Sequence, residues 1–242
     1  PIVKSFQYGQ HTVTLETGTT DQTCTFTVSN ATTGTCDYTV QAGDTSSDLT
    51  TNSISGTIAD QSSNAMSNFT PTTNLAANKA LVIDTTNPTI STLSPADNAT
   101  GVSATANLVL TFDAAVTGGS GNVSIRLASD GSTVEAIAVG SGQVTGSGTS
   151  IITVDPSVTL SASTAYYIHV AGAAFDDVAG NSFAGITDTT TWSFTTADTT
   201  APTITDVSSS AANGSYNAGD IIDIDVTFSE AVTSTGNVTV TL

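Results

Sequence analysis

A seven-residue motif that occurs twice is the feature that most constrains how this chain can fold. The motif reads DTTNPTI at residues 84–90 and DTTAPTI at residues 198–204. The interval between the two copies suits one β-sandwich domain, which takes on the order of 100 residues. The repeat therefore predicts a tandem array of domains, with this motif at each junction. We call the motif the seam.

The composition of the seam predicts a short and stiff connection. Pro88 and Pro202 fix their own φ angles and favour extended conformations for the preceding residues, Asn87 and Ala201. A proline also lacks an N–H group, which suits the first residues of an edge strand. An ordinary proline-containing loop is the alternative.

Between and before the seams, the sequence predicts β-strands. Alternating apolar and polar residues are rich in β-branched types, and Gly, Asn, Asp and Ser separate the runs. Residues 88–95, 107–116, 122–129, 134–139, 150–156, 165–172 and 191–198 give about seven strands in the central unit. Residues 13–18, 23–30, 36–44, 53–60 and 80–84 give further strands before it. The expected inward-facing residues of the central unit are Leu108, Leu110, Phe112, Ile125, Leu127, Ile152, Tyr167, Ile168, Val170, Trp192 and Phe194.

The two flanking units are expected to be incomplete. Residues 226–242 align with residues 110–127, so that Phe228 takes the place of Phe112 and Val240 that of Ile125. Residues 57–69 match residues 174–186. The expected organisation is the C-terminal part of a domain at 1–86, a complete domain at 87–198 and the N-terminal part of a domain at 199–242.

The two partial units are complementary halves of one domain, and two hypotheses follow from this. The chain is either a window from a longer repeat array or a subunit whose tail completes the next copy by strand addition, giving a head-to-tail filament. An unpaired strand edge and an uncovered core face are adhesive, which favours such completion. The residues expected at these contacts are Pro88, Pro202, Phe228, Val238, Val240, Leu242, Val13 and Leu15.

The charge balance narrows the possible partners. Three Lys and Arg residues against 21 Asp and Glu residues give a net charge of −18. No basic patch is available to neutralise phosphates, which argues against nucleic acid as a partner. Runs of about 20 apolar residues, as a membrane-spanning helix needs, do not occur, so no membrane insertion is expected.

Several motifs together resemble bacterial Ig-like domains of the S-layer and surface-adhesin type. They are LTFDAAV at 110–116, DDVAGN at 176–181, WSFTT at 192–196 and PADNATGVSATANL from Pro95, and residues 13–242 share the resemblance through YTVQAGDTSSDL, GTIADQSSNAM, NKALVIDTT and VTFSEAV. The resemblance implies an all-β fold of tandem immunoglobulin-like β-sandwiches at the cell surface or outside the cell. Residues 6–18 also resemble the start of polynucleotide phosphorylase, from which no activity is carried over.

The sequence offers candidates for a disulfide and for a calcium site. Cys24 and Cys36 flank a predicted hairpin and form either one disulfide, which would indicate an oxidising compartment, or two buried thiols. Calcium prefers six to eight carboxylate, amide and carbonyl oxygens, although Asx turns explain the same Asp and Asn residues. The calcium candidates are Asp60, Asn64, Asp84, Asp176, Asp177, Asn181 and Asp198. We expect no other cofactor.

No catalytic group stands out. His11 and His169 lie in strand-like runs, where a structural or surface role is expected, and Trp192 is expected in the core. We therefore expect a structural extracellular protein, a spacer or filament subunit, and not an enzyme. The alternatives are a ligand-binding adhesin module and an accessory domain of a secreted hydrolase.

Overall fold

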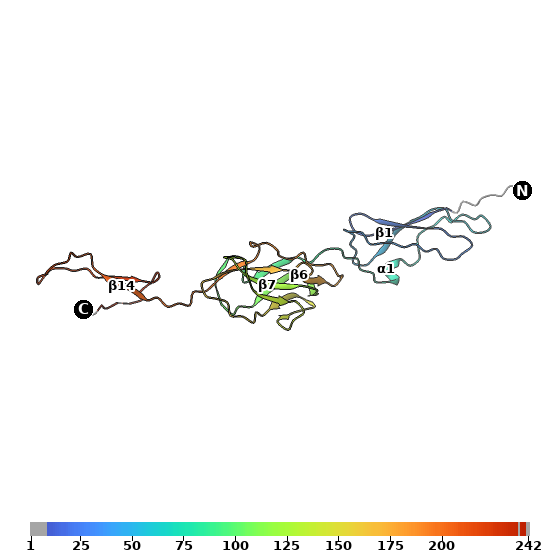
Figure 1. Cartoon of the computed structure of the whole chain (residues 1–242). Coiled ribbons are helices and arrows are strands. Elements are labelled where there is room, and N and C mark those ends of the chain that lie inside the picture. The colour runs from blue at the N-terminus through green and yellow to red at the C-terminus, as the bar shows by residue number, and fades with distance from the viewer. Residues whose placement is uncertain (1–8, 237, 241–242) are drawn as a thin grey trace.

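The chain forms three successive β-structured units in the computed structural model, which describes residues 9–236 and 238–240. Across these residues there are strands β1 to β15 and one short helix, α1. The N-terminal and C-terminal units lie at opposite ends of an extended row, with the central unit between them (Figure 1). The all-β fold predicted from the sequence is confirmed.

The N-terminal unit contains a small antiparallel sheet. Its strands are β1 (His11–Glu16), β2 (Gln22–Phe26) and β3 (Thr50–Ser55), in the order β2-β1-β3. Helix α1 (Leu75–Asn78) begins at Asn74, whose side-chain oxygen accepts the N–H of Leu75 and also that of Thr51 in β3. The buried hydrophobic cluster of this unit consists of only Leu15, Leu49 and Ile83. The core of this unit is therefore much smaller than the core of a complete sandwich.

Two expected strands of the N-terminal unit do not form. Residues 36–44 have no strand, and residues 80–84 have only an isolated bridge between Ile83 and Ser46. Strand formation needs a neighbour as well as a suitable pattern, because the ladder hydrogen bonds come from the adjacent strand. Residues 36–44 have no such ladder with a neighbouring strand among the described residues.

The central unit is a sandwich of two five-stranded sheets. The first contains β4 (Ile90–Ser94), β6 (Leu108–Gly118), β9 (Val144–Thr145), β10 (Thr149–Val154) and β12 (Phe175–Asp177), in the order β12-β6-β10-β9, with β4 also paired to β6. The second contains β5 (Ala99–Val102), β7 (Asn122–Leu127), β8 (Thr133–Ala138), β11 (Ala165–Val170) and β13 (Ser193–Thr196), in the order β5-β13-β11-β7-β8. Only β5 and β13 run parallel to each other. Strand β6 is thus a central strand of the first sheet, with partner strands on both of its edges.

The core of the central unit lies between these sheets. In β6 the side chains of Leu108, Leu110 and Phe112 alternate inward and are at most 3% exposed. Trp192 is fully buried, as predicted, and its indole N–H donates to the carbonyl oxygen of Pro95 at 2.8 Å. Burying large apolar side chains of this kind contributes about 1.5–3 kcal/mol each.

The prediction that Tyr167 faces the core is wrong. Tyr166, not Tyr167, belongs to the core cluster, together with Ile168 and Val170. The three residues obey the period of two that puts alternate side chains on one face of a strand. The hydroxyl of Tyr166 accepts the backbone N–H of Ser161 at 2.9 Å, which satisfies the polar end of a buried ring.

The C-terminal unit is a hairpin of β14 (Ile204–Ser208) and β15 (Asp225–Phe228). Its apolar side chains are largely uncovered, because there is no second layer over them. Phe228 is 38% exposed, whereas Phe112, its counterpart in the central unit, is 3% exposed.

Candidate functional site

The first seam is hydrogen-bonded to the units on both of its sides. On the N-terminal side, the Thr85 hydroxyl donates to the carbonyl oxygen of Asp44 and accepts the N–H of Gly43, both at 3.0 Å. On the other side, the N–H and hydroxyl of Thr89 donate to the carboxylate of Asp113 at 2.8 and 2.6 Å. These donors hold the pKa of Asp113 below its usual value. The junction is therefore anchored at both ends.

A loop of the central sandwich holds the same seam from a distance in sequence. The Asp177 carboxylate accepts the backbone N–H of Asn181 at 2.8 Å and its side-chain amide at 2.9 Å. The Asn181 amide also donates to the backbone oxygen of Asp84 at 3.1 Å. An Asx-type loop closed by Asp177 thus presents Asn181 to the seam.

The second seam repeats the bonds of the first within its own residues. The N–H of Thr200 donates to Asp198 at 2.9 Å, as that of Thr86 does to Asp84. The environments of the two prolines differ, however, since Pro88 is buried and Pro202 is exposed. The second seam has the local geometry of the first but lacks the surroundings that cover it.

The N-terminal unit contains a copy of the seam-holding loop. The carboxylate of Asp60 accepts the backbone N–H of Asn64 at 2.8 Å and its side-chain amide at 2.7 Å. These bonds, led by that of the side-chain amide, keep the pKa of Asp60 below its usual value. The correspondence of Asp60 with Asp177 and of Asn64 with Asn181 therefore extends from sequence to hydrogen-bond geometry.

The residues considered for calcium are spread over the units. The structure brings Asp84, Asp177 and Asn181 together, while Asp60 and Asn64 form a separate loop and Asp198 lies in the second seam. Asp176 accepts the hydroxyl of Ser182 at 2.6 Å. Within residues 9–236 and 238–240, no group of three or more His, Cys, Asp and Glu side chains is arranged to hold a metal ion. The bonds found are those of Asx turns.

Cys24 and Cys36 form a disulfide, with their Cα atoms 5.7 Å apart. The bond joins β2 to the segment at residues 35–40, which has no strand of its own. That segment is thus held beside the small sheet although it makes no ladder with it.

The residues expected at contacts between units fall into two groups. Val13 and Leu15 lie in β1, whose two edges are already paired with β2 and β3, so any further contact there uses a face of the sheet. In the C-terminal unit, Val238 and Val240 are 74% and 47% exposed. They line an apolar groove with Ile204, Val207, Phe228 and Val232. Leu242 lies outside the described residues.

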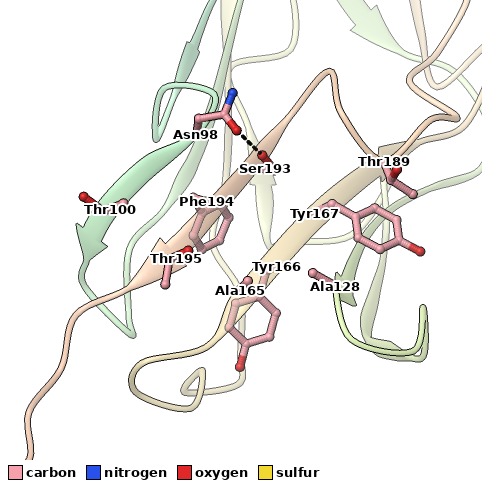
Figure 2. Close-up of a pocket in the computed structure, with 10 residues that line it drawn as sticks. All are labelled: Asn98, Thr100, Ala128, Ala165, Tyr166, Tyr167, Thr189, Ser193, Phe194 and Thr195. Carbon is pink, nitrogen blue, oxygen red and sulfur yellow. Dashed lines mark hydrogen bonds between the residues drawn. The ribbon is translucent and has the colours of Figure 1, made fainter.

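A shallow pocket lies on the second sheet of the central unit, and its lining contains neither a histidine nor a carboxylate. Figure 2 shows Asn98, Thr100, Ala128, Thr189, Ser193 and Thr195 around the rings of Tyr166, Tyr167 and Phe194. The Ser193 hydroxyl is hydrogen-bonded to Asp97 at 3.1 Å and to Asn98 at 3.3 Å, and the lining contains no histidine to activate it. His169 instead packs edge-on against Tyr167, and His11 packs against Phe26. Both histidines have structural contacts.

Sequence reasoning found the seams but missed two of their supports. The role of Thr85 and the contact of Asn181 with Asp84 bridge residues far apart in the chain. The repeat of the Asp60–Asn64 loop in sequence was the available signal, although it indicated only that the loop recurs.

Residues 84–196 match the family described as bacterial Ig-like domain. Among solved structures, the S-layer protein rSbsC is similar at 20% identity with a TM-score of 0.31, over 52% of this chain and 16% of that protein. No curated protein matches the sequence, so the likeness of residues 6–18 to polynucleotide phosphorylase stays a prediction. No helix in the described part of the chain is long and apolar enough to cross a membrane. The central unit is an Ig-like β-sandwich, and its sequence matches the bacterial Ig-like domain family.

Proposed function

We propose that the chain is part of an extracellular structural protein, in which Ig-like units joined by stiff seams act as a spacer. The observation that carries this proposal is the first seam, which is hydrogen-bonded to the N-terminal unit through Thr85 and to the central unit through Thr89 and Asp84. A junction anchored on both sides keeps neighbouring units in line. The extended row of units in Figure 1 is what a spacer requires.

The chemistry of the chain supports a location outside the cell. A disulfide between Cys24 and Cys36 persists in oxidising compartments and is rare in the cytosol. The net charge of −18 keeps such a surface soluble and self-repelling. The match of residues 84–196 to bacterial Ig-like domains agrees with a place at a bacterial surface.

Mechanically, such a unit resists extension through its strand ladders. Pulling on the two ends of the central sandwich loads β4 through the first seam and β13 through the second. Strand β4 is paired with β6 in the first sheet, and β13 is paired with β11 and β5 in the second. Several ladder hydrogen bonds must then break together before the unit opens.

A second function, a head-to-tail filament, is favoured by one specific observation. The pairing of β14 with β15 repeats that of β4 with β6, including the shift in register after the first pair: Ile204 faces Phe228 as Ile90 faces Phe112, and Val207 faces Val226 as Leu93 faces Leu110. Residues 199–236 therefore resemble the start of a sandwich, up to the strand that corresponds to β7, and residues 11–86 resemble its remainder from β7 onward. The partner in this function is a second copy of the chain.

Small-angle X-ray scattering tests the spacer. At concentrations too low for chains to assemble, the purified chain should give a maximum dimension that stays constant from low to high salt, since the hydrogen bonds that anchor the first seam do not depend on charge repulsion. A scattering curve typical of units moving freely on a flexible linker would contradict the spacer. Light scattering of the same samples over a range of concentrations separates single chains from filaments.

A further inference from the structure

We propose that β15 of one chain, together with the residues after it up to Ser234, inserts into the N-terminal unit of a second copy, with residues 35–40 on one edge and the loop at residues 58–60 on the other. This inference deepens the head-to-tail function proposed above and rests on it. In the central unit, β6 occupies this position, because it pairs with β10 on one edge and with β4 and β12 on the other. Within residues 9–86, the N-terminal unit has counterparts of β10 and β12 but none of β6.

The N-terminal unit corresponds to the second sheet of the sandwich. Its order β2-β1-β3 reproduces the order β8-β7-β11, and all of these pairs are antiparallel. Beyond β3, the N–H of Ser46 donates to the oxygen of Ile83 at 2.8 Å, as that of Ser163 does to Ala197 at 3.1 Å. Residues 81–83 thus lie where β13 lies in the central unit.

The loop after β3 corresponds to β12 and its turn. Ala59 forms a bridge with Ala65, as Asp176 does with Ser182. The N–H of Met66 donates to the oxygen of Ile58 at 2.7 Å, as that of Phe183 does to Phe175 at 2.8 Å. The N-terminal unit therefore already contains the segment, residues 58–60, that corresponds to the β12 strand beside β6.

Residues 35–40, TCDYTV, correspond to β10, TSIITV. Tyr38 packs against the small hydrophobic cluster, as its counterpart Ile152 packs in the central core. Val40 is 49% exposed, whereas its counterpart Val154 is fully buried. This segment has the position of β10 but forms no strand, and in the described part of the N-terminal unit it has no β6 counterpart to pair with.

The donor strand has the inward pattern of β6. Val226, Phe228 and Val232 stand at the positions of Leu110, Phe112 and Val116, which are buried. In the central unit, the ring of Phe112 lies 5.5 Å from that of Phe175 and 5.3 Å from that of Phe183. The counterparts of those two rings are Ile58 and Met66, and Met66 is 44% exposed. Insertion would cover Phe228 and Met66 together.

The seam supplies a second contact for the inserted strand. Asn181 binds the oxygen of Asp84 in the seam that precedes the central unit. Asn64 has the same loop geometry, and Asp198 has the same place in the second seam. The inserted chain therefore presents Asp198 to Asn64 of the accepting chain, and Pro202 becomes covered as Pro88 is.

Variants of the full chain that each add one cysteine to the Cys24–Cys36 pair test the predicted register. Asp176 faces Thr117 in the central unit, which places Ala59 opposite Thr233 of the second copy. Facing residues of an antiparallel pair have Cα atoms about 4.5–5.5 Å apart, which suits a disulfide. Ala59→Cys and Thr233→Cys chains, mixed and oxidised, should give a covalent heterodimer whose new bond is located by peptide mapping. Thr19→Cys, in the exposed turn after β1, is the control partner and should link to Thr233→Cys at background level.

Two alanine variants of the Thr233→Cys chain separate insertion from nonspecific adhesion. Phe228→Ala should lower the yield of the Ala59–Thr233 link about tenfold or more, because deleting a side chain from a core contact is strongly destabilising. Ile221→Ala removes an apolar side chain of the same hairpin that is 93% exposed and stands at the position of exposed Thr105. It should leave the yield unchanged.

The outcomes distinguish this inference from the function on which it rests. Linear polymers in light scattering, without the Ala59–Thr233 link, would overturn the insertion and leave head-to-tail assembly in place. Chains that remain single at every concentration would overturn both. Equal losses with Phe228→Ala and Ile221→Ala would overturn the insertion, since adhesion would then be nonspecific.

Discussion

The side-chain amide of Asn181 donates to the backbone oxygen of Asp84, 3.1 Å away, and ties a loop of the central sandwich to the seam that precedes it. The same amide closes its own loop by donating to Asp177. A single side chain therefore couples the fold of one unit to the position of its neighbour. The N-terminal unit has the same loop, at Asp60 and Asn64.

Replacing Asn181 by Ala should weaken the central unit. The change removes both bonds of the amide, and a hydrogen bond contributes about 0.5–1.5 kcal/mol, so the free energy of unfolding should fall by about 1–3 kcal/mol. Trp192 is the only tryptophan and is fully buried in the central unit, so its fluorescence during urea denaturation follows that unit alone. Asn64→Ala is the matched control and should leave the Trp192 transition unchanged. Equal effects of the two variants would contradict the coupling.

Phe112 and Phe228 should differ in their importance to the isolated chain. Phe112 is 3% exposed among aromatic rings, so Phe112→Ala should cost the central unit about 3–5 kcal/mol. Phe228 is 38% exposed, and Phe228→Ala in dilute solution should leave the Trp192 transition in place. Urea denaturation under the same fluorescence readout measures both. A shift of the transition by Phe228→Ala in single chains would mean that the hairpin packs on the central unit.

Alkaline pH should weaken the N-terminal unit through Tyr38. Burial raises the pKa of Tyr38 to about 12, with help from its hydrogen bond to Asp44 and the negative charge there. Because the pKa in the unfolded chain is about 10, the stability from this group is present below pH about 10 and is lost as pH rises toward about 12. Circular dichroism melts of the wild type between pH 8 and pH 11 should show this loss, and Tyr38→Phe should show a smaller one. Identical profiles would rule out the role of this bond.

Asp44, the partner of Tyr38, should make the stability of the N-terminal unit fall at acid pH instead of alkaline pH. The hydrogen bond from Tyr38 is the main cause that holds the pKa of Asp44 below its usual value. Its contribution is therefore present above pH about 4 and is lost as pH falls through the lowered pKa. Asp44→Asn should reduce the acid sensitivity of the N-terminal unit in the same melts.

Calcium removal should leave the central unit unchanged. The oxygens of Asp177 accept the N–H and the amide of Asn181, as in an Asx turn, and these bonds close the loop. The melting temperature from Trp192 fluorescence should be the same with a chelator and with added calcium. A rise of several degrees with calcium would show that these oxygens bind the ion instead.

The sequence predicted the elements with long patterns better than the short ones. All seven expected strands of the central unit are present as β4, β6, β7, β8, β10, β11 and β13. Strands β5, β9 and β12 were missed, since two to four residues carry too little alternation to be distinguished from a turn. Tyr166 and Tyr167 were exchanged because both neighbours are aromatic, and the inward one is set by register with Phe194.

Long-range contacts lay beyond the sequence pattern. The strand expected at residues 36–44 does not form, because a strand needs a neighbour to pair with and the pattern of a segment alone does not show whether one is beside it. The motif at both seams was readable from repetition. The bond from Asn181 to Asp84 depends on how a loop folds back over the junction, which no local propensity encodes.

The most direct test of the account is the molar mass of the purified chain, measured by light scattering over a range of protein concentrations and salt. One chain has a mass of 24.2 kDa. The account predicts a mass that rises with concentration into linear assemblies, and rises further with salt, because screening reduces the repulsion between chains of net charge −18. Phe228→Ala should hold the mass near that of one chain. A mass of one chain for the wild type at every concentration and salt would contradict the completion of one unit by another.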